Sequence, residues 1–358
     1  MMDFNDAPVQ VTHTNSGNRD EMRRDLLARL ESVLFTLFPA GTIPAQNGGR
    51  MAQAMLVSGV KNNLFPDVSQ SERLAGGVKW RKAFVHLNSV QDVALLNARV
   101  FLDALTPAGD FVTIHPGTTT DTEDLVASRA YGIGTLAQAA AAGDIQLLVN
   151  CEHNAEYATL QPFQVGDLLR ISDRPSTGGA GNEEWATIDG ITYGATFATI
   201  DLLDPLVNNF EIANTLISSI WSPGNIAGSW SNFTVTGVST FDTATPGNLV
   251  VHNKGAIEQD WTLTFTDSAN YTVNGNLLGQ LAEVGSIAAD FTPLNPATGT
   301  PYFTLKAAGW GGTSQINDVV SFRTSPAAIP LWYRRQVPAG TFSLANDFAS
   351  VALHGESA

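Results

Sequence analysis

Four acidic residues lie close together in the middle of the sequence and could supply a catalytic acid and base. Asp167 and Asp173 belong to the segment FQVGDLLRISD, and Glu183 and Glu184 follow in NEEWATIDG. Hydrolysis of a glycosidic bond uses two carboxyl groups about 5 to 10 Å apart, which flank the scissile bond. A carboxylate-based glycan or peptidoglycan hydrolase is therefore one hypothesis for this chain.

A second occurrence of the same local pattern favours a structural role for these acids. The segment SQINDVVSFRT resembles FQVGDLLRISD, because Asp318 and Asp167 each end a turn and precede an apolar strand with an arginine near its end. An aspartate at this place accepts hydrogen bonds from neighbouring backbone N–H groups and fixes the turn. Glu183 and Glu184 precede a strand that is expected to return beside the first. We therefore predict that the four acids hold turns.

The other reactive side chains show no spacing that is typical of an active site. The six histidines (positions 13, 86, 115, 153, 252 and 354) form no HExxH or His-x-His pattern, so no zinc site is predicted. Cys151 and His153 would share one face of a strand, but a lone buried cysteine is commoner than a nucleophile. Asp121, Glu123 and Asp124 lack the spacing of a calcium loop, so we expect a solvated acidic loop. We predict no catalytic residue, no metal and no cofactor.

Aromatic residues gather in the last third of the chain and suggest a contact surface. Trp261 lies in the alternating strand WTLTFT and is expected in a core. Trp310 lies in the glycine-rich segment AAGWGGT and is the best candidate for an exposed ring, with Tyr302 nearby in sequence. A carbohydrate or another protein could stack on such rings. Trp310 and Tyr302 are therefore the predicted ligand or interface contacts.

The composition indicates a β-rich globular chain. Of 358 residues, 44% are apolar and only 15% are charged, while 32 glycines and 17 prolines disfavour long helices. One cysteine excludes an intrachain disulfide, and no apolar run is long enough to span a membrane. The polar start predicts no secretory signal and hence folding in a reducing cytoplasm.

The charge distribution separates the first third from the rest. The net charge of −15 argues against binding to nucleic acid, which requires lysine and arginine to neutralise phosphates. Residues 1–135 hold 12 basic and 14 acidic side chains, whereas residues 136–358 hold 7 basic and 20 acidic ones. The acidic second part could simply be a soluble, self-repelling surface, and the alternative interpretation is that partners cover the near-neutral first part.

Periodicity predicts helices early in the chain and strands later. Residues 18–38 place apolar side chains at helical spacing behind a capping-box arrangement of Asn18 and Glu21, and residues 135–144 suggest a short helix stopped by Gly143. After residue 221, seven short alternating segments predict a β-sandwich: NFTVTGVST, GNLVVHN, QDWTLTFTD, NYTVNG, PYFTLKA, DVVSFRT and IPLWYRRQV.

Two stretches resemble virion structural proteins of tailed bacteriophages. The C-terminal block PYFTLKAAGWGGTSQINDVVSFRTSPAAIPLWYRRQVPAG is similar to segments of such proteins. The run QVGDLLRISD, EEWATIDGI and ATIDLLDPL is similar to small β-barrel modules of phage tail, neck and baseplate proteins. The resemblance covers residues 145–358 and implies an assembly protein of the tail or baseplate, present as a ring of three, six or twelve copies.

The combined prediction is a mainly β fold with an α-containing N-terminal region. It comprises an extended arm (1–17), a mixed α/β attachment region (18–144), a small β-barrel-like module (145–220) and a β-sandwich-like domain (221–358). The expected function is a non-enzymatic virion component, made and folded in the host cytoplasm, that binds copies of itself and other virion proteins but neither nucleic acid nor membrane. A carbohydrate- or receptor-binding virion module is the alternative, and the glycan hydrolase is a weaker one.

Overall fold

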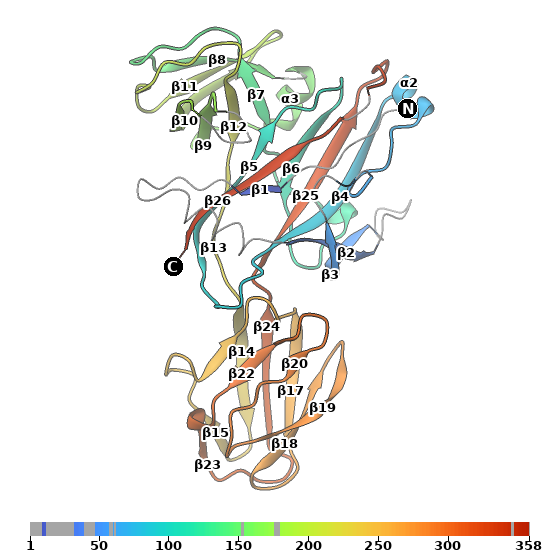
Figure 1. Ribbon diagram of the computed structural model, residues 1–358, viewed down its shortest axis with the longest axis vertical. Coiled ribbons are helices and arrows are strands. Elements are labelled where there is room, and N and C mark those ends of the chain that lie inside the picture. Colours follow the sequence, from blue (N-terminus) through green and yellow to red (C-terminus); the bar gives the residue numbers. More distant parts are fainter. Residues whose placement is uncertain are drawn as a thin grey trace.

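The computed structural model describes residues 9–11, 32–38, 47–56, 60, 62–151, 154–174, 180–344 and 347–357. The fold is mainly β and contains three units stacked along the long axis (Figure 1). A closed barrel lies at one end, a central sandwich in the middle and a second sandwich at the other end. The predicted β-barrel module and C-terminal sandwich are therefore both present.

The central sandwich consists of two sheets. The first has the order β3-β2-β4-β25-β6, with strands β3 (Gly48–Leu56), β2 (Ser32–Phe38), β4 (Gly77–His86), β25 (Ala328–Val337) and β6 (Phe111–Pro116). The second has the order β1-β26-β5-β13, with strands β1 (Val9–Val11), β26 (Ser350–Ser357), β5 (Leu95–Ala104) and β13 (Trp221–Ile226). In both sheets the alternation that pleated strands impose sends every second side chain inward. The shared core includes Ala83, Val85, Val100, Leu102, Leu331, Tyr333, Val351 and Leu353.

The barrel is inserted between β6 and β13 of the central sandwich. Its strands follow the order β10-β11-β8-β7-β12-β9, with β7 (Ile133–Leu136), β8 (Gln146–Cys151), β9 (Leu168–Ser172), β10 (Glu183–Tyr193), β11 (Ala198–Leu202) and β12 (Leu216–Ser219). The short helix α3 (Asn154–Leu160) contributes Tyr157 to the barrel core. Arg170 and Ser218 attach the barrel to β5, since Arg170 Nη1 donates to Asp103 Oδ1 at 2.9 Å and Ser218 Oγ donates to Leu102 O at 2.6 Å.

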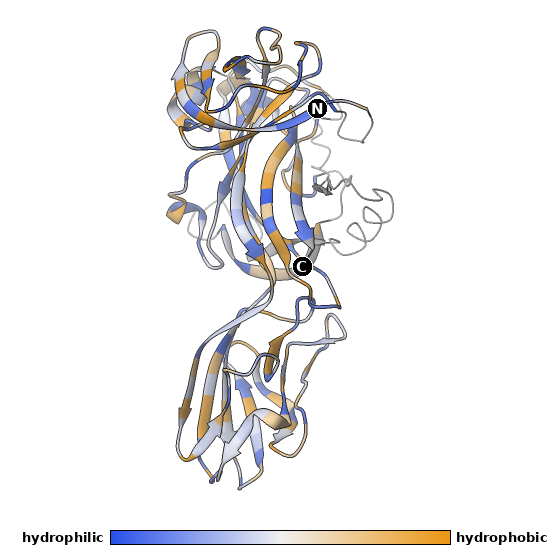
Figure 2. Ribbon diagram, turned by 90° about the vertical axis from the view of Figure 1, so that its left-hand side faces the viewer, coloured by the Kyte–Doolittle hydropathy of each residue, from blue (hydrophilic) through white to orange (hydrophobic). Residues whose placement is uncertain are grey.

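The second sandwich is inserted between β13 and β25. Its main sheet has the order β14-β24-β17-β18-β19, with β14 (Ser229–Thr236), β24 (Val319–Ser325), β17 (Gln259–Phe265), β18 (Asn270–Gly275) and β19 (Gly279–Ser286). The short strands are β15 (Ser239–Phe241) with β23 (Trp310–Gly312), β16 (Leu249–Val251) with β22 (Phe303–Leu305), and β20 (Leu294–Asn295) with β21 (Thr300–Pro301). In β17 the predicted alternation is confirmed, because Trp261, Leu263 and Phe265 are buried. Figure 2 shows this change between hydrophobic and hydrophilic positions along many strands.

The structure divides the chain differently from the predicted consecutive domains. The barrel begins at Ile133 rather than at residue 145, because β7 closes it between β8 and β12. The last two strands leave the predicted 221–358 sandwich: β25 pairs with β4 and β6, and β26 pairs with β5. Within the predicted arm, β1 pairs in parallel with β26. The alternating pattern identified β25 as a strand, but its partners β4 and β6 lie more than two hundred residues earlier in the chain.

Two of the predicted helices need correction. Residues 18–31 of the first lie outside the described residues, and Ser32–Phe38 forms strand β2, antiparallel to β3 and β4. A run of apolar residues this short fits either period, and pairing with the sheet decides it. Residues 137–144 form turns and an isolated bridge between Ala140 and Phe210 instead of a helix. The described helical elements are α2 (Gln70–Ala75), α3 and the 3-10 turns η2 (Glu123–Leu125) and η3 (Ala307–Gly309).

Among the helices that the structure describes, none has the length and apolar character needed to cross a membrane.

A buried lysine joins the acidic loop to the outer face of the first sheet, opposite the shared core. Lys82 of β4 is buried, and its Nζ lies 2.5 Å from Asp121 Oδ1, 2.8 Å from Gly49 O and 3.0 Å from Asp121 O. Burial lowers the pKa of Lys82, and the bond to Asp121 opposes this shift. Trp332 of β25 donates from Nε1 to the same carboxylate at 2.8 Å, so Lys82 fixes the acidic loop onto the sheet.

Replacing Lys82 with methionine is expected to destabilise the central sandwich strongly. The change keeps much of the side-chain volume but leaves Asp121 as an uncompensated carboxylate, which costs about 3–5 kcal/mol when a pair is buried. Lys79→Met is the matched control, because that ammonium is one-third exposed beside Glu72 and such pairs contribute at most about 1 kcal/mol. Urea unfolding followed by tryptophan fluorescence measures both variants. Equal losses of stability would contradict the assigned role of Lys82.

Candidate functional site

The turn before β9 has the structure that the sequence pattern predicts. Asp167 N donates to Gln164 O at 3.1 Å, and Gly166 adopts φ +87°, as the third residue of a type II turn requires. Asp167 Oδ2 accepts the backbone N–H of Gln164 at 2.8 Å. The carboxylate therefore closes the turn on its own backbone, and the prediction of an aspartate-fixed strand start is confirmed.

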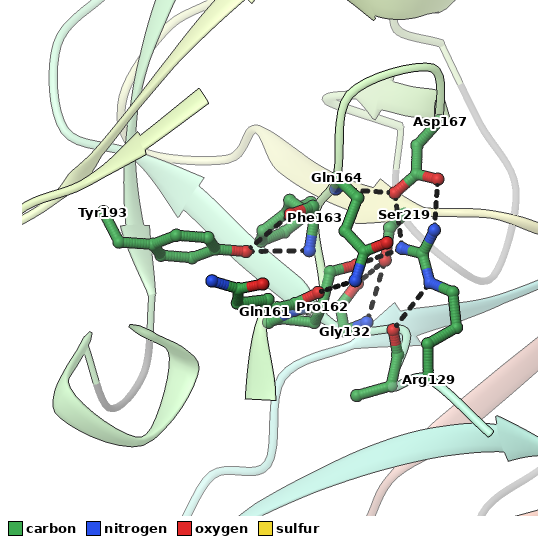
Figure 3. A network of polar contacts seen from close by, with 10 residues as sticks. Arg129, Gly132, Gln161, Pro162, Phe163, Gln164, Asp167, Tyr193 and Ser219 are labelled. Carbon is green, nitrogen blue, oxygen red and sulfur yellow. Dashed lines mark hydrogen bonds and ion pairs between the residues drawn. The ribbon is translucent and has the colours of Figure 1, made fainter. Parts of the chain in front are cut away.

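An arginine from outside the turn neutralises the same carboxylate (Figure 3). Arg129 Nη1 and Nη2 each lie 2.6 Å from Asp167, in a two-pronged ion pair, and Arg129 Nη2 also donates to Pro162 O at 3.3 Å. On the other side of the segment, Tyr193 OH accepts from Phe163 N at 2.9 Å and donates to Phe163 O at 2.8 Å. Residues 162–167 are thus fastened at both ends, and Asp167 serves this attachment.

The other three acids of the sequence hypothesis have separate structural partners. Asp173 accepts the backbone N–H of Asn182 across the start of β10. Glu183 accepts from Arg170 Nη2 at 3.0 Å, and Glu184 accepts the backbone N–H groups of residues 207 and 208 at 2.8 and 3.1 Å. As predicted, the strand that follows returns antiparallel to β9, but β10 already includes Glu183 and Glu184 instead of starting after them. The four carboxylates therefore serve four different contacts.

Asp318 repeats the device in the second sandwich. Its Oδ2 accepts the backbone N–H of Gln315 at 3.1 Å, and its own N–H donates to Gln315 O at 3.1 Å. Asn317 adopts φ +69°, at the place that Gly166 takes in the barrel turn. The same oxygen accepts from Ser239 Oγ at 2.7 Å and from the backbone N–H groups of Ser239 and Val238. Asp318 thus joins two loops at the tip of this sandwich.

The aromatic candidates are used for packing. Tyr302 is 4% exposed, and its ring lies 5.3 Å from that of Trp261. Trp310 is half-buried and contacts the rings of Phe241 and Phe265 at 4.9 and 5.5 Å. A sugar-stacking site needs an accessible ring face, so this arrangement gives the carbohydrate-binding alternative little support.

The remaining sequence candidates also have structural surroundings. In the acidic loop, Asp121 binds Lys82, Glu123 accepts from Asn47 Nδ2 at 2.6 Å, and Asp124 accepts from Thr122 Oγ1 at 2.5 Å. Cys151 is buried, and His153 lies outside the described residues. Within the described ranges, no group of three or more histidine, cysteine or acidic side chains is arranged to hold a metal ion.

One constellation was not predicted from the sequence. His252 Nδ1 lies 2.6 Å from Asp92 Oδ2, and His252 Nε2 lies 2.8 Å from Thr304 Oγ1, the order of groups in a hydrolytic triad. Thr304, however, is 5% exposed and lies in the middle of β22, where it pairs with Val250 of β16. The separation of 160 residues between Asp92 and His252 left no local signal in the sequence.

These residues form the junction between the central and second sandwiches. Asp92 belongs to the loop between β4 and β5, and its Oδ1 accepts the backbone N–H of Asn253 at 2.7 Å. Asn253 Nδ2 donates to Val93 O at 2.9 Å, and His86 Nε2 donates to Asn253 O at 2.8 Å. Burial lowers the pKa of His86, which keeps its imidazole neutral with the proton on Nε2. Asp92 and His252 therefore orient one unit against the other.

Exposed apolar side chains gather at one end of the barrel. Leu206 N donates to Asp144 O at 2.9 Å, and Leu202 N donates to Ile145 O at 2.8 Å, so the loops before β8 and after β11 are locked together. They present Ile145, Leu203 and Val207, which are 58%, 59% and 77% exposed. We call these three residues the barrel-end surface. Exposed apolar groups on a fixed backbone are typical of protein interfaces.

Comparisons with known proteins assign no family. No protein-family model matches the sequence, no curated protein matches it, and no solved structure matches the fold. The functional argument therefore depends on the contacts and surfaces described above.

Removing the Asp318 carboxylate is expected to change the acid stability of the second sandwich. The hydrogen bond from Ser239 Oγ is the main cause that lowers the pKa of Asp318, with backbone N–H groups adding to it. A lowered folded-state pKa gives stability that is present above the unfolded value of about 3.9 and is lost as the pH falls through the folded value. Asp318→Asn should therefore reduce stability at pH 7 and flatten its pH dependence below about 4. Thermal unfolding from pH 7 to 2 tests this, with the exposed Asp189→Asn as control; parallel curves for Asp318→Asn and wild type would contradict it.

Asp92→Ala is expected to loosen the domain junction. The change leaves Asn253 N–H and His252 without their acceptor, so the second sandwich should sample more orientations. Small-angle X-ray scattering should then show a larger radius of gyration, and proteolysis near residues 226–229 should be faster. Asp290→Ala removes an exposed pair with Lys306 away from the junction and serves as control. Unchanged scattering and proteolysis for Asp92→Ala would show that other contacts set the orientation.

Proposed function

We propose that this chain is a non-enzymatic structural component of a phage virion, associated with the tail or baseplate, that assembles as a symmetric ring. The observation that carries the proposal is the barrel-end surface, where rigid loops hold three large apolar side chains in solvent. The resemblance of residues 145–358 to virion proteins gives the class of assembly.

The use of the charged groups supports a structural role. Asp167, Asp173, Glu183 and Glu184 fix turns, an ion pair and a loop, and the Asp92–His252–Thr304 group joins two units around a buried threonine. The partners in this proposal are other copies of the chain and other virion proteins. A net charge of −15 disfavours nucleic acid as a partner.

Negative-stain electron microscopy of the purified protein over a concentration series tests the proposal. We expect closed rings whose copy number is read directly from the images. Mass spectrometry of purified virions should in addition find the chain as a stoichiometric component. Absence from virions would contradict the proposal, as would a glycan- or peptidoglycan-cleaving activity that Glu183→Gln removes.

A further inference from the structure

The barrel-end surface is negatively charged at its rim. Asp144, Asp201 and Asp204 are exposed around the three apolar side chains. The described strands and loops of the barrel, from residue 133 to 219, hold only two basic side chains, Arg170 and Arg174. Arg170 is buried between Asp103 and Glu183, so it does not offset the charge of this rim. A partner surface must therefore offer apolar groups beside cations.

A second exposed apolar surface lies on the central sandwich. Leu74 at the end of α2, Val78 at the start of β4 and Phe342 after β25 are 69%, 44% and 58% exposed, and we call them the helix-side surface. Gly340 N donates to Arg73 O at 2.7 Å, which fixes the loop after β25 against α2. Val78 pairs with Gln336 of β25, so the sheet fixes the backbone position of Val78.

The helix-side surface carries the charge that the barrel end lacks. Arg73 is half-buried beside Leu74, and Lys79 follows Val78. The one acid of α2, Glu72, is already paired with Lys79 at 2.6 Å and with the buried Arg335 at 3.3 Å. Arg335 also faces the buried carboxylates Asp110 and Asp347, so the positive charge next to the apolar groups comes mainly from Arg73. Complementary charge of this kind orients two surfaces as they meet.

The elements that carry the two surfaces lie on opposite sides of the same end of the molecule (Figure 1). In Figure 1 the loops next to β8 and β11 project to the upper left, whereas α2 lies at the upper right. We propose that the barrel-end surface of one copy binds the helix-side surface of the next copy. Such a head-to-tail contact uses two different surfaces and closes into a ring when the rotation per copy permits. This inference rests on the proposed ring assembly and names the surfaces that form it.

Single substitutions on either surface should abolish assembly. Val207→Asp and Leu74→Asp each place a charge in one of the two surfaces at its most exposed apolar side chain, where the contact would bury it without a partner. Sedimentation velocity of the full-length chain should show rings for the wild type and monomers for each variant. Ile316→Asp is the matched control, because Ile316 is 65% exposed on the tip of the second sandwich, away from both surfaces. It should assemble as the wild type does.

A mixture of the two variants distinguishes the head-to-tail contact from a symmetric one. Val207→Asp retains the helix-side surface and Leu74→Asp retains the barrel-end surface, so a 1:1 mixture should form dimers and nothing larger. Assembly of either variant at wild-type strength would overturn the inference. A wild-type chain that stays monomeric at every soluble concentration would overturn it too. The proposed function is tested separately from this contact. Rings that persist in both variants would overturn the head-to-tail contact but support a ring-forming component. Presence of the chain in virions would likewise support the proposed function whatever the result for the contact.

Discussion

The pairing of β4 with β25 is the constraint on which the rest of the structure depends. The two strands pair antiparallel over ten residues, from Gly77 with Val337 to His86 with Ala328. Between them the chain makes the whole barrel and the whole second sandwich and then returns. Closing so long a connection costs entropy that grows only slowly with length, so the insertions are tolerated once the central core repays it. The pairing of β4 with β25 therefore fixes the central sandwich to which both inserted units are attached.

The junctions show how each insertion is held. Arg170 is buried between Asp103 of the central sandwich and Glu183 of the barrel. Burial raises the pKa of Asp103, and the adjacent Arg170 opposes that shift. At the other junction, Asp92 contacts the imidazole of His252 and accepts a hydrogen bond from the backbone N–H of Asn253, both in the second sandwich. Charged groups that resemble catalytic residues by type therefore make the contacts that orient the three units.

Local sequence signals predicted individual strands well but could not predict their partners. The alternation of Trp261, Leu263 and Phe265 identified β17, and the turns ending in Asp167 and Asp318 were recognised because a turn and its carboxylate lie within four residues. The same kind of alternation made β25 a strand but could not place it in the central sandwich. Strand β2 was missed because its apolar residues also fit a helical period. The Asp92–His252 contact left no trace, since only the folded chain brings these residues together.

The burial of basic residues in ion pairs also limits which partners the surface can bind. Lys82, Arg170 and Arg335 are buried with carboxylate partners, so three of a small set of cations are removed from the exterior. The net charge of −15 makes copies of the chain repel one another on average, and Arg73 and Lys79 are basic side chains that lie in the proposed contact. A large apolar side chain contributes about 1.5–3 kcal/mol when it is fully buried, whereas an exposed ion pair contributes at most about 1 kcal/mol. In the proposed contact the apolar centre must therefore supply most of the affinity between copies, and the charges around it decide which two surfaces meet.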